Sequence, residues 1–181
     1  MINIDNARRI EGWMSSQELT FLAKTAWGCS SIIIEVGCYK GRSTKVLADN
    51  TKAIIYAVDP WSGIYYNNEG GRHGIKTDVF DTFEQNLKTE IRNGKVLVAK
   101  QKFSEFNIEL LRFADFIFID GDHRYEEVKH DIYKAKSLLK PGGILAGHDY
   151  GHSEWTGVQK AVNELIPAFQ LVQSIWWCKL E

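Results

Sequence analysis

Residues 32–44 read IIIEVGCYKGRST, an apolar run that passes through an acid into a segment with two glycines. Short runs of β-branched residues without polar alternation are typical of strands buried on both faces of a parallel sheet. Comparable runs follow at Ile54–Val58, Val96–Ala99, Phe116–Ile119 and Ile144–Ala146. The pattern therefore predicts a core of five parallel strands.

Helical patterns alternate with these runs. Apolar residues recur at three- and four-residue steps in Gln17–Trp27, Asp78–Ile91, Arg124–Leu139 and Gly157–Leu165. Pro141-Gly142-Gly143 is expected to end the third of these helices before the next strand. The alternation predicts an α/β fold with a doubly wound, mostly parallel, Rossmann-like sheet.

The C-terminal part of the chain departs from this alternation. Phe169–Val172 and Ile175–Leu180 both have the character of strands, and the connection between them is too short for a parallel crossover. We expect them to pair antiparallel at the edge of the sheet, which brings the number of strands to seven.

Composition limits the class of protein. The chain has 181 residues, a net charge of -1 and 44% hydrophobic residues, which suits one domain over residues 1–181 with a helical segment at 1–30. The near-neutral charge argues against nucleic-acid binding, and no run is long enough for a membrane span. Without a signal-peptide pattern or paired cysteines, the predicted location is the cytoplasm. Residues 61–77 lack a period and are interpreted as a loop that covers the active site.

Four acids lie at or near the ends of the predicted strands: Glu35, Asp59, Asp120 and Asp149. In an open α/β sheet, ligands bind beyond the carboxyl ends of the strands. Four carboxylates at one edge would repel each other unless a cation or a ligand rich in donors neutralises them. Their placement therefore predicts a binding site at this edge.

The turn after the first strand narrows the choice of ligand. Gly37 and Gly41 permit a tight turn, but Tyr39 stands where a dinucleotide-binding fingerprint needs its second glycine, and the P-loop pattern is absent too. Asp59 follows the second strand, where an acid can accept both hydroxyls of a ribose. A nucleoside without a diphosphate but with a positive centre fits this arrangement, and S-adenosylmethionine (SAM) is such a ligand.

From about Ser31 to Trp177 the sequence resembles the class I SAM-dependent methyltransferases. The resemblance rests on four motifs in the usual order, which are EVGCYKGRST, AVDPWSG, FIFIDGDHRYEEVKHDI and LLKPGGILAGHDY. The last two are similar to motifs of bacterial O-methyltransferases that act on macrolide and aminocoumarin sugars and, more distantly, of metal-dependent catechol O-methyltransferases. The resemblance implies methyl transfer to a small hydroxylated acceptor.

The resemblance also implies positions for the cofactor. Its methionine part would lie among the first acid and the glycine-containing turn, the ribose at the second acid, and the adenine near the end of the third strand. The residues expected to contact SAM are Glu35, Gly37, Tyr39, Gly41, Ser43, Asp59, Trp61, Phe103, Ser104 and Asp120.

A divalent metal, Mg²⁺ or Mn²⁺, is implied at Asp120, His148 and Asp149. His148 replaces an acid or amide of the family pattern, which favours Mn²⁺ or leaves His148 to orient Asp149. His123 is expected to be the general base, because an imidazole titrates near neutral pH. Asp122 is the alternative base, or it caps the following helix.

Other interpretations remain open at this point. The chain could bind SAM without a metal or without methyl transfer, and a homo-oligomer is one option for its assembly. An NAD-dependent dehydrogenase is disfavoured by Tyr39 and by the absence of a Tyr-x-x-x-Lys pair after the fourth strand. A non-enzymatic interaction module would leave the clustered acids unexplained.

Overall fold

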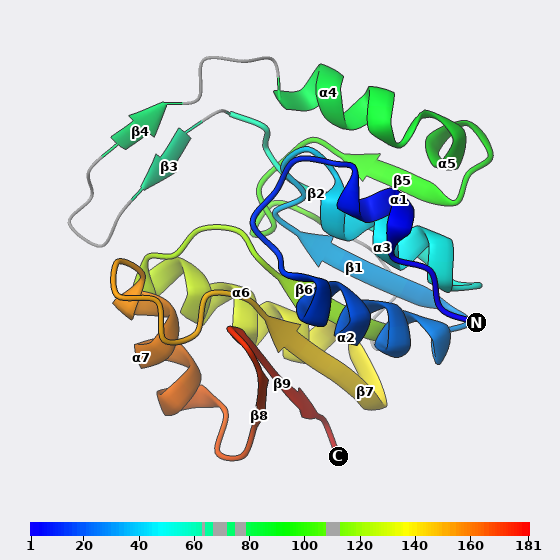
Figure 1. Ribbon diagram of the computed structural model, residues 1–181. Helices are drawn as coiled ribbons and strands as arrows, with labels where there is room; N and C mark the ends of the chain where they lie inside the picture. The colour runs from blue at the N-terminus through cyan, green and yellow to red at the C-terminus, as the bar shows by residue number, and fades with distance from the viewer. Residues whose placement is uncertain (63, 67–71, 75–78, 108–112) are drawn as a thin grey trace.

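A computed structural model describes residues 1–62, 64–66, 72–74, 79–107 and 113–181; for 64–66 and 72–74 it describes the backbone. Its main feature is a seven-stranded sheet with the order β5-β2-β1-β6-β7-β9-β8 (Figure 1). The strands are β1 (Ile32–Val36), β2 (Ile54–Val58), β5 (Val96–Ala99), β6 (Ala114–Ile119), β7 (Leu139–Gly147), β8 (Gln170–Val172) and β9 (Ile175–Lys179). The predicted α/β, doubly wound fold is confirmed.

Strand direction follows the length of the connections. Strands β5, β2, β1, β6 and β7 pair in parallel, whereas β9 is antiparallel to both β7 and β8. Only Gln173 and Ser174 separate β8 from β9, and two residues allow a hairpin but no crossover. The predicted antiparallel C-terminal pair is thus confirmed.

Helices cover both faces of the sheet, as the unbroken apolar strands require. The helices are α1 (Asp5–Arg8), α2 (Ser16–Trp27), α3 (Arg42–Asn50), α4 (Val79–Asn86), α5 (Lys88–Arg92), α6 (Tyr125–Leu138) and α7 (Thr156–Leu165). Helices α1 to α4 pack on the face that buries Ile33, while α6 and α7 pack on the face that buries Ile34. Successive residues of β1 therefore serve two separate cores.

Two predicted boundaries are wrong. The helix expected over Asp78–Ile91 is divided into α4 and α5 at Leu87, whose backbone leaves the helical region (φ -106°, ψ 13°) and whose side chain is fully buried. The strand expected at Ile144 begins at Leu139, so Pro141-Gly142-Gly143 lies inside β7 and not in a turn before it.

Part of the segment expected to be a loop is a hairpin. Strands β3 (Ile64–Tyr66) and β4 (Arg72–Gly74) pair antiparallel within residues 61–77. Residues 63, 67–71 and 75–77 lie outside the described part of the chain. A covering role for this segment stays a prediction.

The N-terminal segment is attached to the turn after β1. Arg42, at the start of α3, donates hydrogen bonds from its guanidinium to the carbonyl oxygens of Ile10 (3.1 Å), Gly12 (3.1 Å) and Met14 (2.8 Å). These bonds hold the chain just before α2 against that turn.

In the described residues, no helix combines the length and apolarity needed to cross a membrane.

Candidate active site

The turns after β1 and β6 touch at the carboxyl edge of the sheet. Gly37 has φ +83°, and a Cβ at this position would lie 2.0 Å from the carbonyl oxygen of Asp120. Both the left-handed backbone and the lack of space require glycine here. This contact places the turn after β1 directly beside Asp120.

Asp59 fastens the same turn. One carboxylate oxygen accepts hydrogen bonds from the backbone N–H groups of Cys38 (2.8 Å) and Tyr39 (3.1 Å), and the other accepts from that of Trp61 (2.6 Å). Burial raises the pKa of Asp59, and the three hydrogen bonds oppose this rise. Asp59 therefore shapes the turn in addition to the ribose contact expected of it.

Within the part of the chain that the structure describes, Glu35 is a fully buried carboxyl group without a hydrogen-bond partner. Neither side-chain oxygen of Glu35 has one, and the residue has no exposed surface. Burial raises its pKa from 4.5 to about 7; the hydroxyls of Ser43 and Thr44 offset part of this, although neither reaches hydrogen-bond geometry. A buried carboxylate of this kind is stabilised by a positively charged ligand.

Three of the other residues expected to contact the cofactor adjoin this turn. Tyr39 (φ +48°) accepts a hydrogen bond at its carbonyl oxygen from the indole of Trp61 (2.9 Å). Gly41 faces the protein: a Cβ there would lie 2.3 Å from the side chain of Leu87. Ser43 is buried beside Glu35.

The two residues expected at the adenine lie farther along the chain. Phe103 is buried in the core beneath α6, with its ring 6.2 Å from that of Phe106. Ser104 is exposed, and its carbonyl oxygen accepts a hydrogen bond from Lys134 (3.0 Å).

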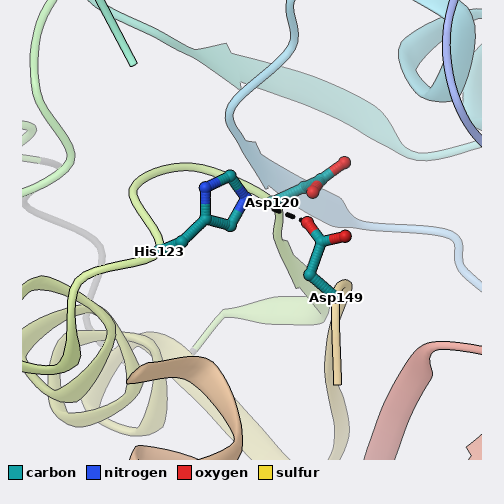
Figure 2. A group of neighbouring side chains, drawn as sticks. All are labelled: Asp120, His123 and Asp149. Carbon is teal, nitrogen blue, oxygen red and sulfur yellow. Dashed lines mark hydrogen bonds and ion pairs between the residues drawn. The ribbon is translucent and has the colours of Figure 1, made fainter. Parts of the chain in front are cut away.

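Asp120, His123 and Asp149 lie together where β6 and β7 end (Figure 2). Nε2 of His123 is 2.9 Å from an oxygen of Asp149, and the imidazole stacks on Trp155 with ring centroids 4.4 Å apart. The other ring nitrogen of His123 points away from Asp149 (Figure 2). The three residues each offer one ligand atom, all within 4.8 Å of one another, so they could hold a metal ion.

His148 adjoins this group and contacts carboxylates through both ring nitrogens. Nδ1 is 3.3 Å from Asp149 and 3.5 Å from Asp120, and Nε2 is 3.2 Å from Glu18. Burial alone would lower the pKa of His148, but the acids outweigh burial and raise it to about 12. Both ring nitrogens of His148 already face carboxylates, so this arrangement supports the orienting role of His148 more than the ligand role.

The acids around His148 respond in different ways. Burial dominates at Asp120 and raises its pKa, while at Asp149 the contacts with His123 and His148 outweigh burial and lower the pKa. The structure brings the four predicted acids to one edge. Glu35 lies in β1 just before the turn that Asp59 holds, this turn touches Asp120, and Asp120 and Asp149 both face Nδ1 of His148.

Asp122, the alternative base, is engaged elsewhere. Its carboxylate accepts hydrogen bonds from the backbone N–H of Arg124 (2.9 Å) and from the guanidinium of the same residue (2.7 Å). These contacts lie just before α6, whose N-cap residue is Arg124 and has no side-chain cap hydrogen bond, so the capping role considered for Asp122 is wrong.

Sequence reasoning missed three residues of the site, which are Glu18, Trp155 and Ser174. Ser174 accepts a hydrogen bond from His148 (2.9 Å) and donates one to Glu18 (2.7 Å). Ser15 and Glu18 form an S-x-x-E capping pattern, a signal that indicates a helix start and nothing about His148. The contacts of these residues depend on the folded chain.

A family model and a curated protein match this chain. Residues 34–150 match a family model described as "Methyltransferase domain". An uncharacterised protein of Acanthamoeba polyphaga mimivirus is 23% identical over 143 residues, which are 76% of this chain and 60% of the viral protein. The chain thus spans about 60% of the length of that curated relative.

Solved structures share the fold at low sequence identity. A SAM-dependent O-methyltransferase from Thermotoga maritima aligns with a TM-score of 0.66 and 16% identity, over 98% of this chain and 70% of that one. A tRNA (m1A58) methyltransferase from Aquifex aeolicus aligns with a TM-score of 0.66 and 12% identity, over 99% and 76% of the two chains. The fold thus occurs both in an O-methyltransferase and in a tRNA methyltransferase.

Proposed function

Because the chain belongs to the methyltransferase domain family, we propose that it transfers the methyl group of SAM to a hydroxyl oxygen of a small acceptor, with His123 as the general base. The observation that carries this proposal is the pairing of His123 with Asp149 at the carboxyl edge of the sheet, 2.9 Å apart. A sugar or a natural product with free hydroxyl groups is the acceptor that the sequence motifs favour.

The cofactor site is supported by the unpaired carboxyl group of Glu35. When bound, SAM supplies a methyl group on a positively charged sulfur, which is open to in-line attack by an oxygen nucleophile. Glu35 has two buried oxygens without partners, and a cationic ligand would relieve the cost of burying its charge. Asp59 holds the turn after β1 in the shape that surrounds such a ligand.

His123 is arranged to accept a proton. A hydrogen bond from Nε2 to Asp149 keeps the proton of a neutral imidazole on Nε2 and leaves the lone pair on Nδ1. Within the described residues nothing hydrogen-bonds Nδ1, and Trp155 fixes the plane of the ring by stacking. An acceptor hydroxyl next to Nδ1 would lose its proton to His123 as the oxygen attacks the methyl group.

A metal-assisted form of the reaction is a second candidate. Two carboxylates and an imidazole within 4.8 Å of one another suit Mn²⁺ or another ion that tolerates nitrogen, and Asp120, His123 and Asp149 would hold it. A divalent ion there would stabilise the acceptor alkoxide. His123 would then be a ligand, and in this form Asp122 is the base to test.

The experiment measures S-adenosylhomocysteine released from SAM with caffeate, methyl rhamnoside or unfractionated tRNA as acceptor. We expect turnover with a small acceptor. His123→Ala should lower kcat about 100-fold or more, the usual size of a general-base effect, and leave the affinity for S-adenosylhomocysteine unchanged. His152→Ala is the matched control, because His152 is exposed, its ring stacks on the same Trp155, and its hydrogen bond to the carbonyl oxygen of Asp149 (3.2 Å) comes from the backbone, which the substitution keeps.

Four results would change the proposal. Full activity of His123→Ala with loss in Asp122→Asn would move the base to Asp122. Loss of turnover in chelator, restored by Mn²⁺, would establish the metal-assisted form. Calorimetric binding of S-adenosylhomocysteine without turnover on any acceptor would indicate a SAM-binding protein, and turnover on tRNA alone would overturn the small-acceptor class.

A further inference from the structure

Four side chains form a continuous row from helix α2 to the proposed base. Glu18 lies 3.2 Å from Nε2 of His148, Nδ1 of His148 lies 3.3 Å from one oxygen of Asp149, and the other oxygen lies 2.9 Å from Nε2 of His123. Acid and imidazole alternate, and each inner member of the row uses both ends of its side chain. We call these four residues the acid–imidazole row.

The inner end of the row is well buried. The side chains of Glu18 and His148 are 5% and 9% exposed. Against the effect of burial, hydrogen bonds from His148, Ser174 and Ser15 lower the pKa of Glu18 to about 2. An ion pair in such an environment is a strong geometric constraint, since the loss of one partner leaves a buried charge unpaired.

Glu18 divides its two oxygens between two contacts. Oε2 accepts a hydrogen bond from the backbone N–H of Ser15 (2.7 Å) and so completes the cap of α2. Oε1 faces His148 and also accepts from the hydroxyl of Ser174 (2.7 Å). The helix cap needs only the contact of Oε2 with Ser15. The contacts of Oε1 with His148 and Ser174 are therefore available to hold His148 in place.

The outer end of the row includes a strained residue. Asp149 has φ +62°, a left-handed conformation that costs free energy in a residue other than glycine. Such a conformation persists only when its surroundings hold it. His148 and His123 contact the two oxygens of Asp149 from opposite sides and therefore fix the direction of its carboxylate.

We propose that Glu18 is a positioning residue of the methyl-transfer reaction, which acts through His148 and Asp149 on the orientation of His123. This inference rests on the proposed function, because it presupposes that His123 is the base. Helix α2 is suited to the task, since Arg42 ties the segment before it to the turn that surrounds the cofactor. The acid–imidazole row would thus fix the position of the base relative to the cofactor.

The test compares Glu18→Ala, Glu18→Gln and Ser15→Ala in the full chain. Glu18→Ala should lower kcat about 10- to 100-fold while KM for SAM stays within about twofold, since loss of an orienting partner costs activity by that order. Glu18→Gln keeps an oxygen that accepts from Ser174 and should recover most of kcat. Ser15→Ala removes only the capping hydroxyl and should match the wild type.

A second readout needs no acceptor. Imidazole ¹H–¹⁵N spectra with S-adenosylhomocysteine bound report the state of each ring, and the His123 signals are assigned by their absence in His123→Ala. We expect Glu18→Ala and Glu18→Gln to shift the signals of both His148 and His123, and Ser15→Ala to shift neither. If Glu18→Ala does not fold, Glu18→Gln carries the spectroscopic measurement, and His123 signals that do not move in Glu18→Gln would overturn the proposal.

The outcomes separate the two proposals. If His123→Ala keeps full turnover, the proposed function fails, whatever Glu18 does. If His123→Ala loses turnover while Glu18→Ala keeps kcat and the His123 signals do not move, the positioning role of Glu18 is overturned. An equal loss in Ser15→Ala and Glu18→Ala would also overturn it, because the effect would then belong to the helix cap.

Discussion

In the protein without its cofactor, replacing Glu35 by glutamine should favour the variant over the wild type by an amount that grows with pH. The folded protein raises the pKa of Glu35 from 4.5 to about 7, so the unfolded chain ionises this group first. The stability associated with protonated Glu35 is complete below pH ~4.5, falls as the pH rises through 7, and is absent above that. Glutamine carries no charge and removes this dependence.

The size of the effect follows from the two pKa values. Ionisation of Glu35 costs about 0.8 kcal/mol of folding free energy near pH ~5 and about 3.3 kcal/mol near pH ~8. The difference between wild type and Glu35→Gln should therefore change by about 2.5 kcal/mol between these conditions. The buried amide of the variant has its own unsatisfied groups, but their cost is the same at both pH values and cancels.

The assay is urea unfolding of both proteins at the two pH values, with Glu105→Gln as the control for the same substitution on an exposed residue. The repulsion that Glu35 exerts on Asp59 and Asp120 works in the same direction, because it also grows with pH. A difference that stays constant between the two conditions would refute the conclusion that Glu35 is buried as an unpaired carboxyl group.

Two further substitutions test the fold around the site. Gly37→Ala should cost about 3 kcal/mol or more in urea unfolding, because a Cβ would meet the carbonyl oxygen of Asp120 at 2.0 Å in addition to the left-handed strain. Gly94→Ala has the same strain at φ +76° with no atom within 4 Å and should cost about 1 kcal/mol, so equal losses would contradict the close approach at Gly37. Asp115→Ala should cost about 2–4 kcal/mol at neutral pH, because it leaves the backbone N–H of Ser31 (2.6 Å) without its acceptor. Despite burial, the partners of Asp115 lower its pKa, so this loss should shrink as acid protonates the carboxylate, and a pH-independent loss in urea titrations would argue against the charged contact.

The sheet could be predicted because its signal is local. Ile32–Val36 and Ile54–Val58 are strands with the predicted bounds, since a continuous apolar run has few alternatives to a strand buried on both faces. The division of the helix at Leu87 could not be predicted, because the helical pattern continues through it. Its cause is tertiary: Leu87 packs onto Gly41, which is far away in sequence.

Part of the site could also be predicted, and part could not. The acids at strand ends could be placed because parallel strands bring their carboxyl ends to one edge. The contact of Glu18 with His148 spans 130 positions, and no local pattern records which distant side chain faces a buried imidazole. The roles expected of individual residues in binding the cofactor and the metal stay predictions, which the variants described above would test.

The placement of β9 affects how the enzyme is made. β7 has β9 as its neighbour, and β8, although synthesised earlier, lies on the far side of β9. In a nascent chain on the ribosome, one edge of β7 therefore stays unpaired until residues beyond 174 emerge. An unpaired strand edge of this kind favours aggregation. His148 also lacks its contact with the Ser174 hydroxyl until then. We therefore expect fragments that end before β9 to aggregate and to be inactive.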